Sequence, residues 1–321
     1  MAECWQIVVP EPFPASALAL LDERFDVRVG RSGAAYGEDE LIALAGQADA
    51  LAIYSRDRIS ARVLAALPQL TVIAKGGSRP SSNVDIEAAQ RRGVRVLGTP
   101  GATAGSVAEL AMARMLSLAR DLPALRNRLA HGGWRDFGLL GRELAGTTVG
   151  LIGFGAVGRE VAARCRAFGQ QVLVFDPNLD DQCAEALGAA GVEFEELLAR
   201  SDIVSLHCEL NAATARLIDG EALARMKSGA WLINTARGGL VDEQALLAAL
   251  DAGLLAGAAL DVFAVEPPPT GHSLVGHPRV LCTPHVAAFT TESIHRESAW
   301  ALEDAARVLQ GLAPRYAPAQ G

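Results

Sequence analysis

Short apolar runs alternate with longer amphipathic segments along almost the whole chain, and this alternation limits the fold more than any other feature. In the first hundred residues we expect strands at Gln6–Pro10, Phe25–Val29, Ala50–Tyr54, Thr71–Ala74 and Val94–Leu97. Helical periodicity fills the gaps, at Ser16–Arg24, Glu38–Ala45, Arg62–Leu67 and Ile86–Arg92. Such alternation predicts parallel βαβ units, because a parallel neighbouring strand needs a crossover connection.

A second alternating series follows a break at Gly98-Thr99-Pro100-Gly101. A long apolar helix is expected at Ala104–Ala119, and then a polar segment that holds Trp134. The second series begins at Thr148–Ile152 and continues to about Pro284, and one amphipathic helix is expected at Thr291–Gln310. We therefore predict an α/β protein with two doubly wound parallel-sheet domains, which suits a chain of 321 residues.

Composition excludes several function classes. The formal net charge is −8 and only two lysines are present, so no basic cluster exists to neutralise nucleic-acid phosphates. No apolar stretch is long enough to span a membrane, and the amino-terminus has no signal-peptide pattern. The five cysteines are scattered without a CxxC pair, which indicates reduced thiols in a cytoplasmic protein. We expect no metal ion, nucleic acid or membrane as a partner.

A glycine-rich loop is the strongest local motif. The segment Gly153-Phe154-Gly155-Ala156-Val157-Gly158 has the form G-x-G-x-x-G, and it follows an apolar strand and opens a helix expected at Arg159–Phe168. The first glycine permits a tight turn, the second lets the backbone approach a pyrophosphate, and the third lets helix and strand pack closely. This context predicts that the loop binds a dinucleotide at the free N–H groups of the helix.

Asp176 ends the next strand, Gln171–Phe175, at about the expected distance from the glycines. A carboxylate there accepts hydrogen bonds from the adenine ribose and repels a 2′-phosphate, and no arginine follows it directly. The sequence therefore favours NAD over NADP.

Three later strands end in polar residues, at the sheet edge where doubly wound folds bind ligands. Arg237 stands between a buried strand and two glycines, Glu266 follows the strand that ends at Asp261, and His285 follows a strand and a proline. A guanidinium grips a carboxylate through two parallel bonds, and a histidine transfers protons near neutral pH. We expect Arg237 to bind the carboxylate and polarise the carbonyl of a 2-keto acid, His285 to act as general acid and base, and Glu266 to orient the histidine.

Taken in order, these motifs resemble the D-isomer-specific 2-hydroxyacid dehydrogenases. The resemblance covers nearly the whole chain and includes Thr99-Pro100-Gly101 with Val107–Leu110, the glycine loop with Asp176, Asn234–Gly238, Asp261–Phe263 with Glu266-Pro267, and Thr283-Pro284-His285. It implies that Arg237, Glu266 and His285 are catalytic, and that His207, Thr235, Ala236 and Asp261 line the cofactor site. It also implies NAD as cofactor and a homodimer joined through the cofactor domain.

The resemblance further implies a split substrate-binding domain. Residues 1–99 and 286–321 would form a flavodoxin-like substrate-binding domain, and residues 100–285 an inserted NAD-binding Rossmann domain. The substrate would be a small 2-keto acid or the D isomer of a 2-hydroxy acid.

Two segments depart from the family pattern. The family usually has His-x-Pro-Leu-Thr where this chain has His207-Cys208-Glu209-Leu210-Asn211, which puts the shape of that cofactor loop in question. The loop from Lys75 to Asp85 is slightly longer than usual and contains Arg79 and a proline. We expect Gly77, Ser78 and Arg79 to contact substrate, with Arg79 binding a second anionic group or remaining solvated. Trp134 and Phe289 are candidates for the apolar walls of the pocket or for the core.

Two other readings stay open. A related NAD enzyme could oxidise another small anion such as phosphite, whereas formate enzymes usually carry Gln in place of Glu266. A non-enzymatic NAD-sensing protein, similar to the C-terminal-binding-protein corepressors, shares the fold, but the intact Arg–Glu–His set favours turnover.

Overall fold

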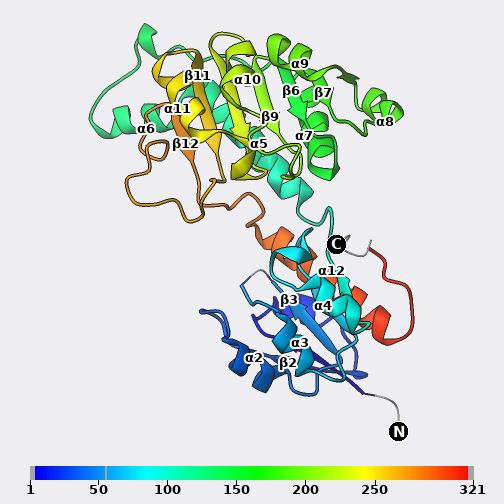
Figure 1. Ribbon diagram of the computed structural model, residues 1–321. Helices are drawn as coiled ribbons and strands as arrows, with labels where there is room; N and C mark the ends of the chain where they lie inside the picture. Colours follow the sequence, from blue (N-terminus) through cyan, green and yellow to red (C-terminus); the bar gives the residue numbers. More distant parts are fainter. Residues whose placement is uncertain (1–3, 55, 317–321) are drawn as a thin grey trace. The chain divides into compact units, whose positions relative to one another are not determined.

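The computed structural model describes residues 4–54 and 56–316, and it forms two compact units (Figure 1). Unit 1 runs to Thr103 and resumes at Phe289, whereas unit 2 is the continuous segment Ala104–Ala288. Each unit has its own parallel sheet with helices packed on it, and each is described separately below.

Unit 1 contains a five-stranded parallel sheet in the order β2-β1-β3-β4-β5. This is the flavodoxin-like order, with its switch point between β1 and β3. Its strands and helices are β1 (Trp5–Val9), α1 (Ala15–Leu18), β2 (Phe25–Val29), α2 (Glu38–Ala45), β3 (Ala50–Ile53), α3 (Ala61–Ala65), β4 (Val72–Lys75), α4 (Ile86–Arg91), β5 (Arg95–Leu97) and α12 (Thr291–Leu309).

Unit 2 contains a seven-stranded parallel sheet in the order β12-β11-β10-β9-β6-β7-β8. The six strands β8-β7-β6-β9-β10-β11 follow the Rossmann order, with β12 added beside β11, and the winding of the chain reverses direction between β6 and β9. Its strands and helices are α5 (Ala104–Arg120), α6 (Leu122–Ala130), β6 (Thr148–Ile152), α7 (Ala156–Ala167), β7 (Gln171–Phe175), α8 (Asp181–Ala186), β8 (Ala189–Gly191), α9 (Phe194–Arg200), β9 (Ile203–Leu206), α10 (Gly220–Arg225), β10 (Ala230–Asn234), α11 (Glu243–Asp251), β11 (Leu255–Leu260) and β12 (Val280–Cys282).

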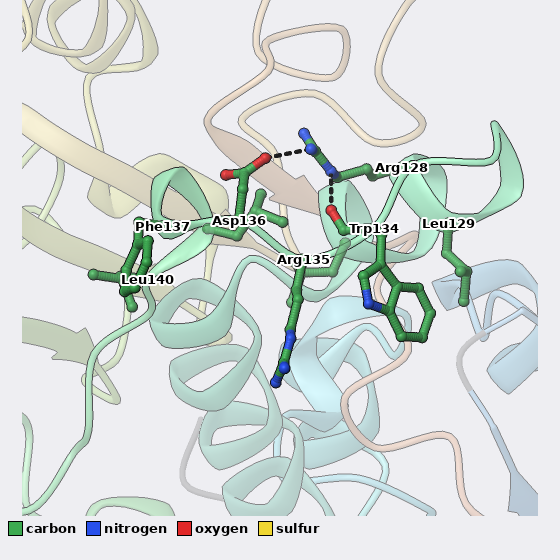
Figure 2. Close-up of a pocket in the computed structure, with 10 residues that line it drawn as sticks. Arg128, Leu129, Trp134, Arg135, Asp136, Phe137 and Leu140 are labelled. Carbon is green, nitrogen blue, oxygen red and sulfur yellow. Dashed lines mark hydrogen bonds and ion pairs between the residues drawn. The ribbon is translucent and has the colours of Figure 1, made fainter.

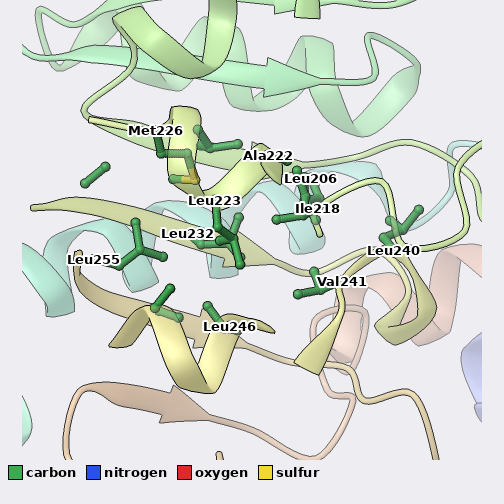
Figure 3. Close-up of a cluster of buried hydrophobic side chains, with 14 of the residues drawn as sticks. Leu206, Ile218, Ala222, Leu223, Met226, Leu232, Leu240, Val241, Leu246 and Leu255 are labelled. Carbon is green, nitrogen blue, oxygen red and sulfur yellow. The ribbon is translucent and has the colours of Figure 1, made fainter. Parts of the chain in front are cut away.

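Successive residues of the buried strands in unit 2 supply two separate cores. Leu232 of β10 joins the cluster beneath α10 and α11, together with Leu206 and Leu246 (Figure 3). Its neighbours Trp231 and Ile233 belong to the opposite cluster, with α5 and α7. Helices therefore cover both faces of the sheet, which explains why its central strands are largely apolar.

The last helix returns to the first sheet. Along α12, Ala301, Leu302 and Ala305 are fully buried with Val72 and Ala74 of β4 in one cluster. Thr290 caps this helix, since its side chain accepts a hydrogen bond from the Ser293 N–H. The returning helix thus completes unit 1 and covers one face of its sheet.

The expected α/β architecture of two doubly wound parallel sheets is confirmed, and beyond shifts of one or two residues at the ends of elements there are three larger differences. The helix expected at Ser16–Arg24 ends at Leu18, because the chain continues in tight turns and Asp22 accepts hydrogen bonds from Arg24. Helix α7 begins at Ala156, three residues before the expected start, with Gly155 as its N-cap. The segment that holds Trp134 is preceded by an unforeseen helix, α6.

Among the described residues, no helix has both the length and the apolarity needed to cross a lipid bilayer.

Candidate active site

The glycine loop lies at the carboxyl end of β6, where the unit 2 sheet changes its direction of winding. Gly153 has a φ of +98°, and a Cβ there would lie 2.6 Å from the backbone nitrogen of Cys208, so only glycine fits. A Cβ at Gly158 would lie 2.2 Å from the Gly153 carbonyl oxygen, which is the close helix–strand approach expected of the third glycine. Around Gly155, by contrast, nothing lies within 4 Å of an added Cβ. The loop is therefore tight on the protein side and open beside the start of α7, as a pyrophosphate site requires.

Asp176 is hydrogen-bonded to the same loop. Its Oδ2 accepts a hydrogen bond of 2.7 Å from the Phe154 N–H, and its Oδ1 accepts one of 2.9 Å from the Asn178 N–H. These bonds fix the carboxylate at the end of β7, where the adenine ribose of a dinucleotide is expected.

Two buried polar atoms that follow the neighbouring strands β9 and β10 have no hydrogen-bond partner within the described part of the chain. They are Nδ1 of His207, after β9, and Oγ1 of Thr235, after β10. The other ring nitrogen of His207 lies 2.9 Å from the Ser205 hydroxyl. Burial lowers the pKa of His207 to about 4, so the ring is neutral at physiological pH. Orphaned polar atoms at two neighbouring strand ends fit a polar cofactor there.

The divergent loop after His207 makes its own turn. The Asn211 side chain accepts hydrogen bonds from the N–H groups of Ala213 and Thr214, and the Thr214 hydroxyl donates to the Glu209 carbonyl. Glu209 itself is exposed. Asn211 thus caps a compact turn without the proline and threonine that the family usually has.

His285 and Glu266 are in direct contact. Nδ1 of His285 lies 2.7 Å from Oε2 of Glu266, and Oε1 of Glu266 accepts a hydrogen bond from the Phe263 N–H at 3.0 Å. The carboxylate therefore joins the loop after β11 to the imidazole after β12. Because Nδ1 faces Glu266, the Nε2 atom is the one left for a substrate.

Asp261 holds the turn that presents His285. It is 1% exposed, and its carboxylate accepts hydrogen bonds from the Thr283 hydroxyl (2.6 Å) and from the N–H groups of Val286 (3.0 Å) and Ala287 (2.8 Å). His285 has a φ of +53°, a conformation that non-glycine residues adopt only when their surroundings hold them there. From the sequence we expected Asp261 to line the cofactor site. In the structure its carboxylate accepts hydrogen bonds from these three donors.

Arg114 supports the same turn from α5, a role that the sequence did not suggest. Its Nη2 donates a hydrogen bond of 2.8 Å to the Thr283 hydroxyl oxygen. The same hydroxyl donates a hydrogen bond to Asp261, so Arg114, Thr283 and Asp261 form one chain of hydrogen bonds. Arg114 is one of the few charged residues of this helix, and that was the only signal in the sequence.

Arg237 follows β10, and its Nη1 donates to the carbonyl of Ala236 at 2.6 Å. The next residue, Gly238, packs so closely on the loop after β11 that an added Cβ would lie 1.9 Å from the Phe263 carbonyl carbon. The loops that carry Arg237 and Glu266 are therefore in backbone contact at the carboxyl edge of the sheet.

The remaining predicted site residues, Gly77, Ser78 and Arg79, belong to unit 1 and follow β4. The Gly77 N–H donates to the Thr99 hydroxyl at 2.8 Å. Within the described residues, the backbone N–H groups of Ser78 and Arg79 donate to no protein acceptor. Trp134 and Phe289 are 73% and 71% exposed, so the reading of either as a core residue was wrong.

Comparisons with known proteins agree with this geometry. Residues 112–287 match the model of the NAD-binding domain of D-isomer specific 2-hydroxyacid dehydrogenases. The chain belongs to this family. Its matched segment includes the glycine loop, Asp176 and the residues after β9 to β12, so NAD is its cofactor and it is an oxidoreductase of the 2-hydroxy acid class.

Three proteins illustrate how similar its relatives are. The chain is 37% identical to a hydroxypyruvate reductase of Thermotoga maritima, over 91% of this chain and 94% of that protein. It is 36% identical to a D-3-phosphoglycerate dehydrogenase of Archaeoglobus fulgidus over 97% of this chain, but it spans only 59% of that longer protein. The solved structure of the TT0316 protein from Thermus thermophilus superposes with a TM-score of 0.86 at 37% identity, covering 97% of this chain and 99% of that one.

Proposed function

We propose that this 2-hydroxyacid dehydrogenase uses His285, Glu266 and Arg237 to interconvert a small 2-keto acid and its 2-hydroxy acid. The contact of 2.7 Å between His285 Nδ1 and Glu266 Oε2 carries the proposal. A histidine paired with a carboxylate on one nitrogen is oriented to transfer a proton from the other.

In the direction of reduction, the chemistry that NADH would supply when bound is a hydride for the 2-carbon of the keto acid. His285 donates the proton on Nε2 to the carbonyl oxygen, while Glu266 keeps the hydrogen bond on Nδ1 and compensates the positive imidazole. The products are the 2-hydroxy acid, NAD⁺ and neutral His285. In the reverse direction the neutral Nε2 takes the proton from the alcohol.

Arg237 binds the substrate carboxylate and stabilises the negative charge that develops on the carbonyl oxygen. The loop after β4 contributes Gly77, Ser78 and Arg79 to substrate binding. The N–H groups of Ser78 and Arg79 support this role, because they donate to no acceptor among the described residues. Arg79 would bind a second anionic group on substrates that have one.

For the cofactor, the residues that would hold the pyrophosphate are Gly153, Phe154, Gly155, Ala156, Val157 and Gly158. Asp176 would bind the adenine ribose, and His207, Thr235, Ala236 and Asp261 would line the rest of the site. The open space beside Gly155 and the orphaned atoms of His207 and Thr235 support this assignment.

The test is a panel of 2-keto acids, with phosphite as an alternative donor, assayed with NADH or NAD⁺ and with their 2′-phosphorylated forms. We expect turnover of at least one keto acid with a clear preference for NADH. His285→Ala should lower kcat by about 10²–10⁴-fold and leave NADH binding unchanged. His131→Ala is the control, because it removes an exposed ring whose Nδ1 is hydrogen-bonded to the Asn127 carbonyl. Full activity of His285→Ala, or faster phosphite oxidation, would contradict the proposal.

We also propose that two copies associate through unit 2. The support is the segment 121–142, called the arm below, which leaves the unit at Arg120 and returns where the Arg142 N–H donates to the Ala119 carbonyl. No residue of its helix α6 is buried. Its exposed apolar side chains are Leu122, Leu129, Trp134, Phe137 and Leu140. Several large exposed apolar side chains on one segment are typical of a protein interface.

A cytoplasmic location is the remaining proposal. It rests on the five cysteines, all of which are free thiols, as expected in a reducing compartment. The test is fractionation of the native host. Finding the chain in an oxidising compartment would contradict the proposal.

A further inference from the structure

Glu297, on α12, is a largely buried residue whose carboxyl group has no hydrogen-bond partner among the described residues. It is 7% exposed, yet it makes no hydrogen bond or ion pair with any residue in the ranges 4–54 and 56–316. Other buried carboxylates of this chain are treated differently: Asp261 has three donors, and Asp304 accepts from the N–H groups of Arg315 and Tyr316. A carboxyl buried for structural reasons would be hydrogen-bonded in the same way.

The carboxyl faces the turn after β4. Its Oε1 lies 3.8 Å from the position that a Cβ would take at Gly77, and its Cβ lies 3.4 Å from the equivalent position at Gly76. Gly77 begins the loop whose next two N–H groups, on Ser78 and Arg79, are free to bind an anion. An ionisable oxygen therefore stands beside the loop proposed above to bind substrate.

Several charged or titratable groups surround Glu297. Lys75 comes from β4, Arg296 is its neighbour on α12, and Tyr54 follows β3, with its hydroxyl bonded to Ser298. The Lys75 ammonium is already directed to the Arg79 carbonyl (2.9 Å) and the Ser82 hydroxyl (2.8 Å). Burial outweighs the attraction of the two cations and raises the pKa of Glu297 to about 7. The neutral and ionised forms thus exchange within the physiological pH range.

We propose that Glu297 is a substrate-binding residue of the loop after β4, whose neutral carboxyl donates a hydrogen bond to the carboxylate of the 2-keto acid and whose ionised form repels it. The inference rests on the proposed function of Gly77, Ser78 and Arg79. It adds a protonation switch for substrate affinity that acts independently of His285. The site therefore binds the substrate anion only when Glu297 carries a proton, since two carboxylates in contact cannot both remain ionised at low cost.

The test uses oxamate, an unreactive analogue of a 2-keto acid that stays a monoanion throughout the pH range. Because the charge of His285 would also affect anion binding, the dissociation constant is measured by calorimetry in His285→Gln protein saturated with NADH. We expect the dissociation constant to rise about tenfold between pH 6 and pH 8, since only the neutral form of a group with a pKa near 7 binds. Adding Glu297→Gln, which keeps a neutral donor, should make the dissociation constant low and independent of pH.

Glu292→Gln in the same His285→Gln background is the matched control, because Glu292 is an exposed glutamate in the first turn of the same helix. It should preserve the tenfold rise. A flat profile before Glu297 is changed, a rise that persists after Glu297→Gln, or no oxamate binding at any pH would overturn the inference. The catalytic proposal is judged separately, by the turnover of His285→Ala, so the two can fail independently.

A stability measurement confirms that each variant folds and reports on Glu297 without any ligand. A carboxyl with a raised pKa stabilises the folded state fully below the unfolded pKa of 4.5, and this contribution is lost as pH rises through about 7. Wild-type protein should therefore lose stability relative to Glu297→Gln between pH 4.5 and pH 8. Equal pH dependence of the two urea midpoints would show that Glu297 does not titrate in this range, which would also overturn the inference.

Discussion

At the residue scale, the catalytic proposal depends on how a histidine with a left-handed backbone is kept in place. His285 contributes one side chain to the site, but five hydrogen bonds from its neighbourhood define its position: two made by its own N–H, to the carbonyls of Asp261 and Thr283, and three accepted by the Asp261 carboxylate. The sequence could not reveal this, because the motif Thr283-Pro284-His285 shows neither the backbone conformation nor the partners of Asp261. It did identify His285 and Glu266 as a pair, because both follow neighbouring parallel strands and such strand ends meet at one edge.

Removing the Thr283 hydroxyl tests this support. In Thr283→Val the side chain keeps its shape, but Asp261 loses a donor and Arg114 Nη2 loses its acceptor. Because a small displacement of a reacting group is costly, we expect kcat to fall about tenfold or more, with a smaller change in the KM for the keto acid. Thr283→Ser, which restores the hydroxyl, should recover most of kcat. A valine variant with the kcat of wild type would show that the chain of hydrogen bonds does not position His285.

At the element scale, the strength of the local pattern decided how well the sequence predicted structure. Strands β2, β6 and β7 and helix α2 have the bounds expected from periodicity alone, because each is a strongly patterned segment bounded by turn residues. Helix α6 was missed because it buries none of its residues, so its apolar side chains show no face turned towards a core. Glu297 was missed for a different reason: its contact with the loop after β4 joins segments more than 200 residues apart.

The contact between the loops after β10 and β11 gives a prediction at this scale. A Cβ at Gly238 would lie 1.9 Å from the Phe263 carbonyl carbon and 2.4 Å from the Ala264 nitrogen, and backbone atoms cannot move aside cheaply. Gly238→Ala should therefore displace the loop that carries Glu266, with a loss of about 1–3 kcal/mol in the free energy of unfolding and a large loss of kcat/KM.

Gly276→Ala is its control. This glycine lies in the connection between β11 and β12, and an added Cβ there has nothing within 4 Å. Urea unfolding and steady-state kinetics of the two variants make the comparison. If both alanine variants behave like wild type, the loops have more freedom than their close approach indicates.

At the scale of the whole molecule, the arm is the part of unit 2 that the fold of one chain does not explain. It lines an open hollow of about 740 Å³ with charged side chains and with apolar ones, among them Leu129, Trp134 and Leu140 (Figure 2). Arg128 fixes its shape by donating to the Trp134 carbonyl at 2.8 Å and by pairing with Asp136. A loop that makes these internal bonds while Phe137 remains 90% exposed is suited to meet another surface.

Sedimentation velocity with arm variants tests whether that surface is a second copy. The double substitution Phe137→Ser and Leu140→Ser removes two apolar side chains that make little contact within the chain, so each folded subunit should be unaffected while the dimer dissociates at micromolar concentration. Leu20→Ser, which removes an exposed leucine of unit 1, should leave the dimer intact. The thermal midpoint should depend on protein concentration in wild type and not in the arm variant, because dissociation and unfolding are coupled only in a dimer. A wild-type protein that sediments as a monomer, or an arm variant that remains dimeric, would place the interface elsewhere and leave the apolar arm to another partner.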